Sequence, residues 1–251
     1  MPGRTVLVTG MSGLIGTALR RHLEGRYDLR ALNRSRIEGL PCHQADIADL
    51  AAIEPAFKEA DVVVHLAARA HGGNAWTDIH HHNIVGTYNV FEAARRAGVP
   101  RVVYASSGAT VSACEAEEPW ASIAAGRYGG LTTWPLFTHE SPARPSGLYG
   151  VSKVFGETLA HHYANAHGMS MIGLRIGAVN REDRPTEPRE FSVWLSQRDA
   201  VQAIERAVTA PENLRFAVCF VTSDNRWSYR DATHARDVLG YVPQDRAENY
   251  R

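Results

Sequence analysis

Tyr149 and Lys153 are the two side chains whose types and spacing suggest catalysis most clearly. They lie four residues apart at the start of a helix expected over 149–167. At about 3.6 residues per turn, both side chains share one face of that helix. A nearby ammonium favours the phenolate and moves the phenol's pKa, ordinarily about 10, toward the range of an acid/base catalyst. The pair therefore predicts proton transfer at a hydroxyl, although the same spacing also occurs where the tyrosine only packs and the lysine is solvated.

A glycine-rich turn near the N-terminus predicts a dinucleotide site. Residues 5–10 form a β-rich apolar run that ends in glycine, and an amphipathic helix is expected over 14–24. Gly10 permits a tight turn, Gly13 lets the backbone approach a pyrophosphate, and Gly16 lets the helix pack against the strand. The helix N-terminus adds N–H groups and the positive end of its dipole. A strand, a glycine turn and a helix in this order favour phosphate binding.

The remaining chain alternates strand and helix patterns, which predicts the α/β class with a Rossmann-type doubly wound parallel sheet. Several strands are continuous apolar runs, as expected when helices cover both faces of a sheet. We expect one domain over 1–251, with about 177–251 as a small C-terminal substrate-binding part. The expected strands are 28–33, 61–66, 101–106, 171–176 and 216–222, and the further helices are 49–59, 83–97 and 198–209.

A long, aromatic-rich segment over 112–146 separates the strand 101–106 from Tyr149. Structureless connections of this length are uncommon in compact domains and are usually functional or mobile. Two interpretations stay open, a lid over the substrate and a surface embellishment.

Composition limits the partners and the location of the chain. Its net charge is zero, which gives no basic footprint for nucleic acid or for a membrane surface. The first strand begins four residues after the initiator Met, which leaves no room for a signal peptide, and no apolar run reaches a membrane-spanning length. The three cysteines lie far apart and outside any C-x-x-C. We expect a cytoplasmic protein with a small-molecule substrate and no nucleic-acid or membrane partner, and a homodimer stays open.

The run His80, His81 and His82 raises the question of a metal site. Consecutive helical side chains point about 100° apart, so three in a row cannot converge on one ion. We therefore expect a helix surface here and no metal.

These motifs together resemble the extended short-chain dehydrogenase/reductase family, of the NAD-dependent epimerase/dehydratase type, over nearly the whole chain. The resemblance implies that Tyr149 is the acid/base, that Lys153 lowers its pKa and bonds the nicotinamide ribose, and that the cofactor is NADP or NAD. The cofactor residues it implies, besides Tyr149 and Lys153, are Gly10, Ser12, Gly13, Leu14, Ile15, Gly16, Asn33, Arg34, Asp46, Ile47, Leu66, Ala67, Ala68, Asn83 and Ile176.

Four segments of the C-terminal half, 144–153, 174–177, 189–196 and 239–243, are close to the pattern of the uronate dehydrogenases, so within that family this half is most similar to that group. Ser107 is the hydroxyl nearest to the position where many members of the family have their catalytic serine or threonine, so we expect it to be the substrate-polarising, catalytic donor. The alternative interpretation has Ser106 packing under the sheet. Gly108 and Ala109 replace polar residues of the uronate dehydrogenases. Arg189 matches the arginine that pairs with a substrate carboxylate, for which a guanidinium is well suited. A solvated loop arginine is the alternative. The substrate residues implied are Arg189, Ser107, Gly108 and Ala109.

Cofactor choice depends on the end of the second strand, where an acidic residue would bond the ribose 2′-hydroxyl of NAD. This chain has Asn33 there, followed by Arg34 and Arg36. Because no carboxylate repels a 2′-phosphate and Arg34 is able to pair with one, we favour NADP over NAD. The alternative is that both arginines are solvated.

The sequence therefore predicts an NAD(P)-dependent oxidoreductase that transfers hydride between nicotinamide and a hydroxyl or carbonyl of a sugar-like or carboxylated small molecule. A nucleotide-sugar epimerase or dehydratase is one alternative. A non-catalytic NADP-binding sensor is another, because Gly108 and Ala109 weaken the site.

Overall fold

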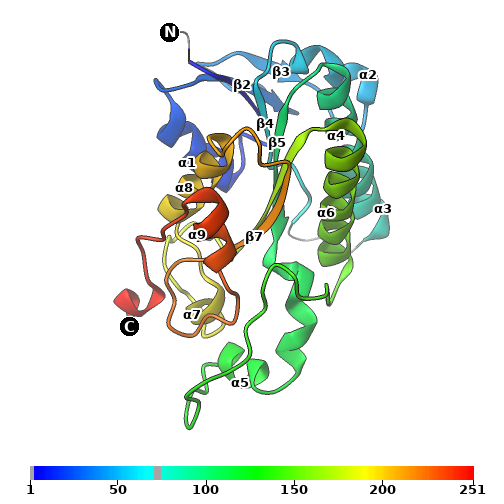
Figure 1. Ribbon diagram of the computed structural model, residues 1–251. Coiled ribbons are helices and arrows are strands. Elements are labelled where there is room, and N and C mark those ends of the chain that lie inside the picture. Colours follow the sequence, from blue (N-terminus) through cyan, green and yellow to red (C-terminus); the bar gives the residue numbers. More distant parts are fainter. Residues whose placement is uncertain (1–2, 71–74) are drawn as a thin grey trace.

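The computed structural model describes residues 3–70 and 75–251 and is built around a seven-stranded sheet (Figure 1). All strand pairs are parallel, in the order β3-β2-β1-β4-β5-β6-β7. The strands are β1 (Thr5–Thr9), β2 (Asp28–Asn33), β3 (Cys42–Gln44), β4 (Val62–His65), β5 (Arg101–Ser107), β6 (Ser170–Ile176) and β7 (Phe216–Val221). The order reverses between β1 and β4, so a crevice opens at their carboxyl ends. The predicted Rossmann-type fold is confirmed.

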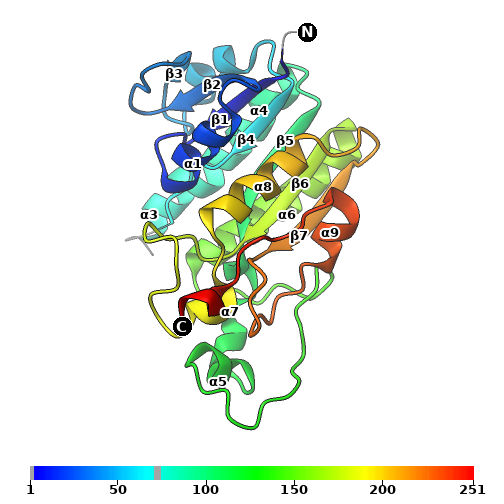
Figure 2. The ribbon, with the colours of Figure 1, turned by 90° about the vertical axis from the view of Figure 1, so that its left-hand side faces the viewer.

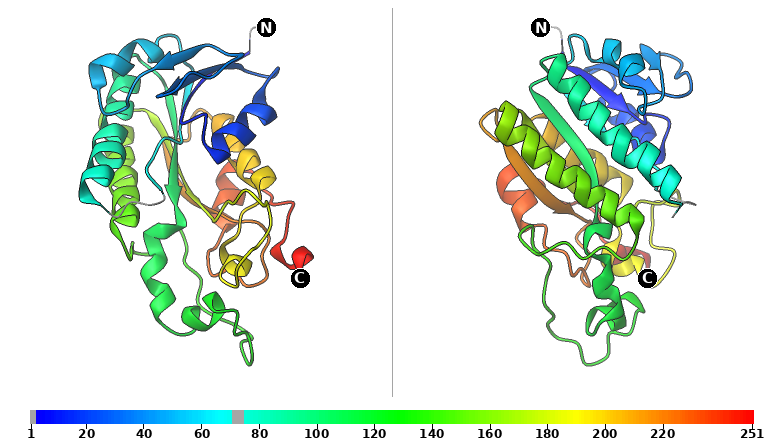
Figure 3. Two further views of the ribbon diagram at one scale, coloured as in Figure 1. Left: turned by 180° about the vertical axis from the view of Figure 1, so that it is seen from behind. Right: turned by 90° about the vertical axis from the view of Figure 1, so that its right-hand side faces the viewer.

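Helices cover both faces of the sheet (Figures 1 and 3). One face carries α1 (Leu14–Leu23), α8 (Gln197–Val208) and α9 (Thr233–Leu239). The other carries α2 (Leu50–Ile53), α4 (Gly86–Arg96) and α6 (Leu148–His167). Within the described ranges, no helix is both long and apolar enough to cross a membrane.

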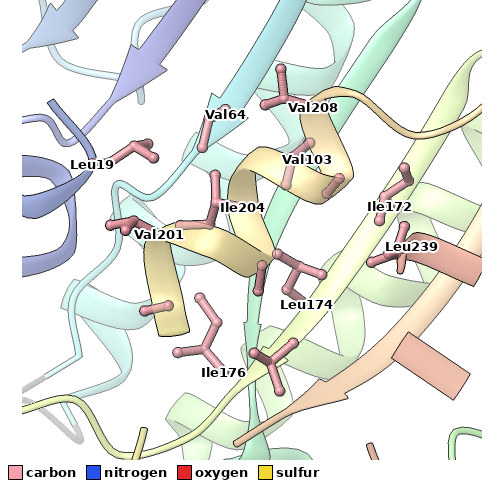
Figure 4. Packing of buried hydrophobic residues seen from close by; sticks show 14 of the residues in the cluster. Leu19, Val64, Val103, Ile172, Leu174, Ile176, Val201, Ile204, Val208 and Leu239 are labelled. Atoms are coloured by element: carbon pink, nitrogen blue, oxygen red, sulfur yellow. The ribbon is translucent and has the colours of Figure 1, made fainter. Parts of the chain in front are cut away.

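Strand alternation builds two apolar cores from one sheet. In β1, Val6 and Val8 belong to the core under α1 and α8, whereas Leu7 belongs to the core under α4 and α6. Figure 4 shows Val201 and Ile204 of α8 among the aliphatic side chains of β4, β5 and β6, including Val64, Val103 and Leu174. Full burial of each such side chain contributes about 1.5–3 kcal/mol. The cores hold the strand ends, and therefore the crevice, in fixed positions.

Most expected elements agree with the structure to within one residue at each end, two differ, and one strand was not expected. The helix expected over 49–59 ends early and continues as a 3-10 turn, η1 (Glu54–Phe57), because Pro55 has no N–H to donate. The helix expected over 83–97 begins earlier, with α3 (Trp76–Asp78) and a π-helix, η2 (Ile79–Val85), ahead of α4. The strand β3 was not predicted, because it is only three residues long and lacks an apolar run.

The segment 112–146 contains the end of a 3-10 helix, η3 (Gly108–Ala116), and the short helix α5 (Trp120–Ala124). It lies beyond the carboxyl end of the sheet (Figure 2). Its residues share a buried cluster with the C-terminal part of the chain: Val111, Cys114, Ile123, Phe137, Val193, Phe220, Trp227 and Tyr229. This packing joins the segment to 177–251, and closure over a substrate stays a prediction.

Candidate active site

The turn between β1 and α1 leaves no room for side chains at two of its glycines. Gly10 has a φ of +74°, which favours glycine, and a Cβ there would lie 2.8 Å from the Ala67 nitrogen. A Cβ on Gly16 would lie 2.5 Å from the Gly10 oxygen. Gly13 is the N-cap of α1 and has no side-chain capping bond. The start of α1 thus presents bare backbone to the crevice, which fits a pyrophosphate.

A cavity of about 510 Å³ continues from this turn toward β2 and β3. Asn33 is buried, and its amide is already bonded: its oxygen accepts from Ser12 Oγ (3.2 Å) and its nitrogen donates to the Ser35 carbonyl (2.9 Å). Arg34 is exposed on the rim. Several residues predicted to hold the cofactor line this cavity, namely Gly10, Ser12, Gly13, Asn33, Arg34, Asp46, Ile47, Leu66, Ala67 and Ala68.

Asp46 lies in the same cavity, beside two histidines of η2. Although burial raises the pKa of Asp46, the Ala48 N–H and His81 lower it by more, so the group stays ionised. Ligand atoms of Asp46, His81 and His82 lie within 4.8 Å of one another, while His80 stacks on Trp76 instead. The three histidines do not converge, as expected, but two of them meet a carboxylate from another element. The prediction of no metal stays a prediction.

A second cavity, of about 790 Å³, adjoins the first and reaches the carboxyl ends of β5 and β6. The two share Gly10, Gly13, Leu66 and Ala68, so together they form one crevice. The predicted residues that line the second cavity are Leu14, Ile15, Gly16, Ser107, Ala109, Tyr149, Lys153, Ile176 and Arg189. Residues of the C-terminal part that the sequence analysis did not single out also line it, including Asn180, Arg181, Glu187, Glu190 and Arg230.

Tyr149 and Lys153 come together on α6, as their spacing predicts. Lys153 is 3% exposed, its ammonium donates to the Ala105 carbonyl (2.7 Å), and it lies 5.5 Å from the centre of the Tyr149 ring. The helix approaches β5 closely, since a Cβ on Gly156 would overlap the Tyr104 ring. This packing brings the pair to the floor of the second cavity.

The electrostatics of the pair differ from the sequence expectation. Burial raises the pKa of Tyr149, and the Ser107 hydroxyl opposes that rise. Burial also lowers the pKa of Lys153 to about 7, against the attraction of the Glu157 carboxylate. Desolvation of both groups, rather than the charge of the lysine, is therefore the main influence on the phenol in this structure.

Ser107 ends β5 and caps η3, where its Oγ accepts from the Ala109 N–H (3.1 Å). Its neighbour Ser106 is buried and donates to Glu157 Oε1 (2.5 Å), and it also lines the second cavity. Gly108 is buried, and it does not line either cavity as the structure describes them. A Cβ on Gly108 would overlap the guanidinium of Arg230.

Arg189 faces a carboxylate of the chain itself. Its Nε and Nη2 donate to Glu115 Oε2 (2.6 Å) and Oε1 (2.8 Å), so the bidentate edge expected to bind a substrate acid is filled. Tyr229 also donates to Glu115 (2.6 Å). Glu115 and Arg189 are 74 positions apart in the sequence. Glu115 belongs to η3, and the two side chains meet only because the folded chain places η3 beside Arg189.

Asn83, predicted to contact the cofactor, has its side chain bonded elsewhere. Its oxygen accepts from the Arg69 N–H (2.7 Å), and its nitrogen donates to Ser152 Oγ (3.0 Å). Ser152 in turn donates to the Tyr149 carbonyl (2.7 Å). The asparagine thus fixes the segment after β4 against α6, the helix that carries Tyr149 and Lys153.

The profile of the NAD dependent epimerase/dehydratase family matches residues 6–190. The chain belongs to this family. It is 33% identical to L-arabinose 1-dehydrogenase (NAD(P)(+)) of Haloferax volcanii, over 96% of both chains. It is also 33% identical to the NAD-dependent glucose-6-phosphate dehydrogenase of that organism, over 98% of this chain and 95% of the relative.

A solved structure of a mutated uronate dehydrogenase from Agrobacterium tumefaciens, complexed with NAD, matches with a TM-score of 0.83 and 33% identity. The match covers 99% of this chain and 87% of that one. These relatives confirm the predicted class, an NAD(P)-dependent oxidoreductase, and the resemblance to uronate dehydrogenase.

Proposed function

We propose that this protein is an NAD(P)-dependent dehydrogenase that oxidises a hydroxyl carbon of a sugar or sugar derivative, or reduces the corresponding carbonyl. The observation that carries the proposal is the meeting of Tyr149, Lys153 and Ser107 in a cavity continuous with the glycine turn. The dehydrogenases to which the chain is similar act on arabinose, glucose 6-phosphate and uronates, which supports a sugar-like substrate.

In the proposed reaction Tyr149 accepts the proton of the substrate hydroxyl during oxidation and returns it during reduction. Ser107, whose hydroxyl influences the pKa of Tyr149, donates to the reacting oxygen and orients it. Lys153, whose ammonium nitrogen lies 5.5 Å from the centre of the Tyr149 ring and which lines the same cavity, is expected to bond the nicotinamide ribose. When bound, the nicotinamide ring is the hydride carrier.

The test is incubation with NAD or NADP and a panel of aldoses, uronates, sugar phosphates and nucleotide sugars, with reduced nicotinamide followed by fluorescence. A dehydrogenase accumulates reduced cofactor with at least one sugar. An epimerase instead converts a nucleotide sugar without net reduction, and a sensor binds cofactor but converts nothing. Either of those results would overturn the proposal.

We further propose that NADP is preferred. The residue at the end of β2 is Asn33 rather than an acidic residue, its amide is bonded to Ser12 and Ser35, and the exposed Arg34 that follows it lines the cavity. Arg34→Ala is expected to weaken NADP binding by about 1.5 to 3 kcal/mol, the scale of a hydrogen bond to a charged group, and to leave NAD binding nearly unchanged.

The matched control is Arg36→Ala, an exposed arginine of the same loop that does not line the cavity as described. Titrating Arg34→Ala and Arg36→Ala with NAD and with NADP measures the affinity of each variant for each cofactor, and so tests the preference for NADP. Equal losses of NAD and NADP affinity in Arg34→Ala would refute the preference, and Asn33→Asp is expected to shift the enzyme toward NAD.

A further inference from the structure

Two arginines and one glutamate form a charge cluster at the substrate end of the crevice. Glu115 accepts both donors of the Arg189 fork and the Tyr229 hydroxyl. Arg230 Nη2 lies 3.9 Å from Glu115 Oε1, which is too long for a hydrogen bond. Because one carboxylate faces two guanidinium groups, the cluster carries one positive charge in excess.

Nearby acidic residues do not neutralise this charge by direct pairing in the described structure. Glu190 lines the same cavity, but its carboxylate accepts from Asn180 and Thr186. Glu187 also lines the cavity and is exposed to solvent, where its interactions are screened. Among the described residues, the acidic group nearest to Arg230 is therefore Glu115, which is already bonded to Arg189.

Arg230 is only 4% exposed, and its hydrogen bonds are incomplete. Nη2 donates to the Gly108 carbonyl (3.2 Å), while the buried Nε has no partner among the described residues. A buried charge is costly unless it is paired and its donors are bonded. The enclosed Nε is out of reach of a bound molecule, but Arg230 lines the second cavity and its Nη1 has no hydrogen bond to a described residue, so an acceptor group of a bound molecule is able to pair with this end of the guanidinium.

Gly108 explains how the guanidinium reaches this position. A Cβ on residue 108 would overlap Cζ, Nη1 and Nη2 of Arg230, so any larger residue would displace the arginine. The sequence alone suggested that Gly108 and Ala109 deplete the site of polar groups. The structure shows instead that a cation from the loop after β7 occupies the space beside Gly108.

We propose that Arg230 binds an anionic oxygen group of the substrate, a carboxylate or a phosphate, and that Glu115 holds Arg189 beside it as a supporting residue. This proposal rests on the proposed dehydrogenase function and names the class of sugar that it takes. A guanidinium donates from several N–H groups in a fixed plane, which suits both oxyanions.

The kinetic test compares a neutral aldose, its uronate and its 6-phosphate as substrates of the cofactor-saturated enzyme. The wild type should have a kcat/KM for one of the two anionic sugars at least about tenfold above that for the neutral sugar. Arg230→Met should reduce that advantage to about threefold or less, mainly through KM. Arg236→Met, an exposed arginine of α9, is the control and should retain the advantage. Which anionic sugar loses more distinguishes a carboxylate substrate from a phosphate substrate.

A binding test uses inorganic phosphate and acetate as probes. Saturating NADP or NAD keeps the probes out of the pyrophosphate site, and sodium chloride keeps the ionic strength equal in all samples. Ligands that bind only the folded state raise its melting temperature. The probe should stabilise the wild type and not Arg230→Met. Glu115→Gln frees Arg189 and adds a second unpaired cation, so it should tighten binding of the same probe. An increase in affinity cannot arise from general loss of structure, which makes this variant decisive if Arg230→Met folds poorly.

The outcomes separate this inference from the proposed function. If a neutral sugar is oxidised best and Arg230→Met affects all three sugars alike, the dehydrogenase stands and the anion site is refuted. If no sugar is oxidised but the probes bind through Arg230, the dehydrogenase fails and the anion site stands. Probes that bind equally to the wild type, Arg230→Met and Glu115→Gln would overturn the anion site.

Discussion

Lys153 lies between two aromatic rings, 5.1 Å from the centre of Tyr104 and 5.5 Å from that of Tyr149. Aromatic faces attract an ammonium at such distances, and so does the nearby Glu157 carboxylate. Burial opposes both and brings the pKa of Lys153 to about 7. Glu157 is itself held by Arg175 through two bonds of 2.9 Å. The charge on Lys153 therefore depends on the buried Glu157–Arg175 ion pair beside it.

The phenol of Tyr149 is the group expected to transfer the proton. Tyr149→Phe removes only that hydroxyl, so turnover should fall by about 10² or more while cofactor affinity stays nearly unchanged. Initial rates and fluorescence titration with the cofactor measure the two effects. Tyr88→Phe, at a half-exposed tyrosine of α4, is the control and should behave as the wild type. Unchanged turnover in Tyr149→Phe would contradict the assignment of the acid/base.

At the scale of elements, close approach of backbones decides where the cofactor site forms. A Cβ on Gly16 would lie 2.5 Å from the Gly10 oxygen and 2.6 Å from the Met11 oxygen, both backbone atoms that cannot rotate away. Gly16→Ala should therefore destabilise the fold by about 1–3 kcal/mol and weaken cofactor binding, because α1 must shift. Urea unfolding and cofactor titration measure these effects. Gly129→Ala, at a glycine with open space around it, is the control. A stable variant with normal affinity would refute the tight packing of α1.

Sequence patterns predicted the elements well where the signal is local. The apolar runs of β4 and β5 and the glycine turn before α1 each lie within a few consecutive residues. The Glu115–Arg189 ion pair and the place of Arg230 beside Gly108 were missed, because each depends on elements far apart in the chain. No local spacing indicates such contacts. The sequence shows that residue 108 is a glycine and therefore leaves space beside the site. Only the folded structure shows that the Arg230 side chain fills that space.

At the scale of the whole molecule, a buried histidine ties the two halves of the sheet together at the point where the strand order reverses. His65 at the end of β4 is hydrogen-bonded through both ring nitrogens. Its Nδ1 lies 2.7 Å from Thr9 Oγ1 of β1, and its Nε2 lies 3.2 Å from Thr87 Oγ1 of α4. It is 1% exposed, and burial lowers its pKa to about 3. The histidine is therefore neutral in the folded protein at every pH where the protein is expected to work.

This neutral histidine makes stability depend on pH. Between the ordinary pKa of histidine, 6.5, and the folded value of about 3, the unfolded chain binds a proton that the folded chain does not. The free energy of unfolding should therefore fall as the pH drops below about 6.5, by up to about 1.4 kcal/mol per pH unit for this group. Carboxyl groups such as Glu92, with a pKa of about 2, add to the loss only below their ordinary value of 4.5.

Urea unfolding at several values between about pH 5 and pH 6.5 measures the histidine contribution, because Lys153, with a pKa of about 7, adds its own pH dependence mainly above this window. His65→Gln should flatten the slope in this window, because glutamine does not titrate. His161→Gln, at an exposed position of α6, should keep the wild-type slope. His82 and His234 also have lowered pKa values and are less buried, so a reduced slope will persist in His65→Gln. An unchanged slope in His65→Gln would show that the loss of stability arises elsewhere in the molecule.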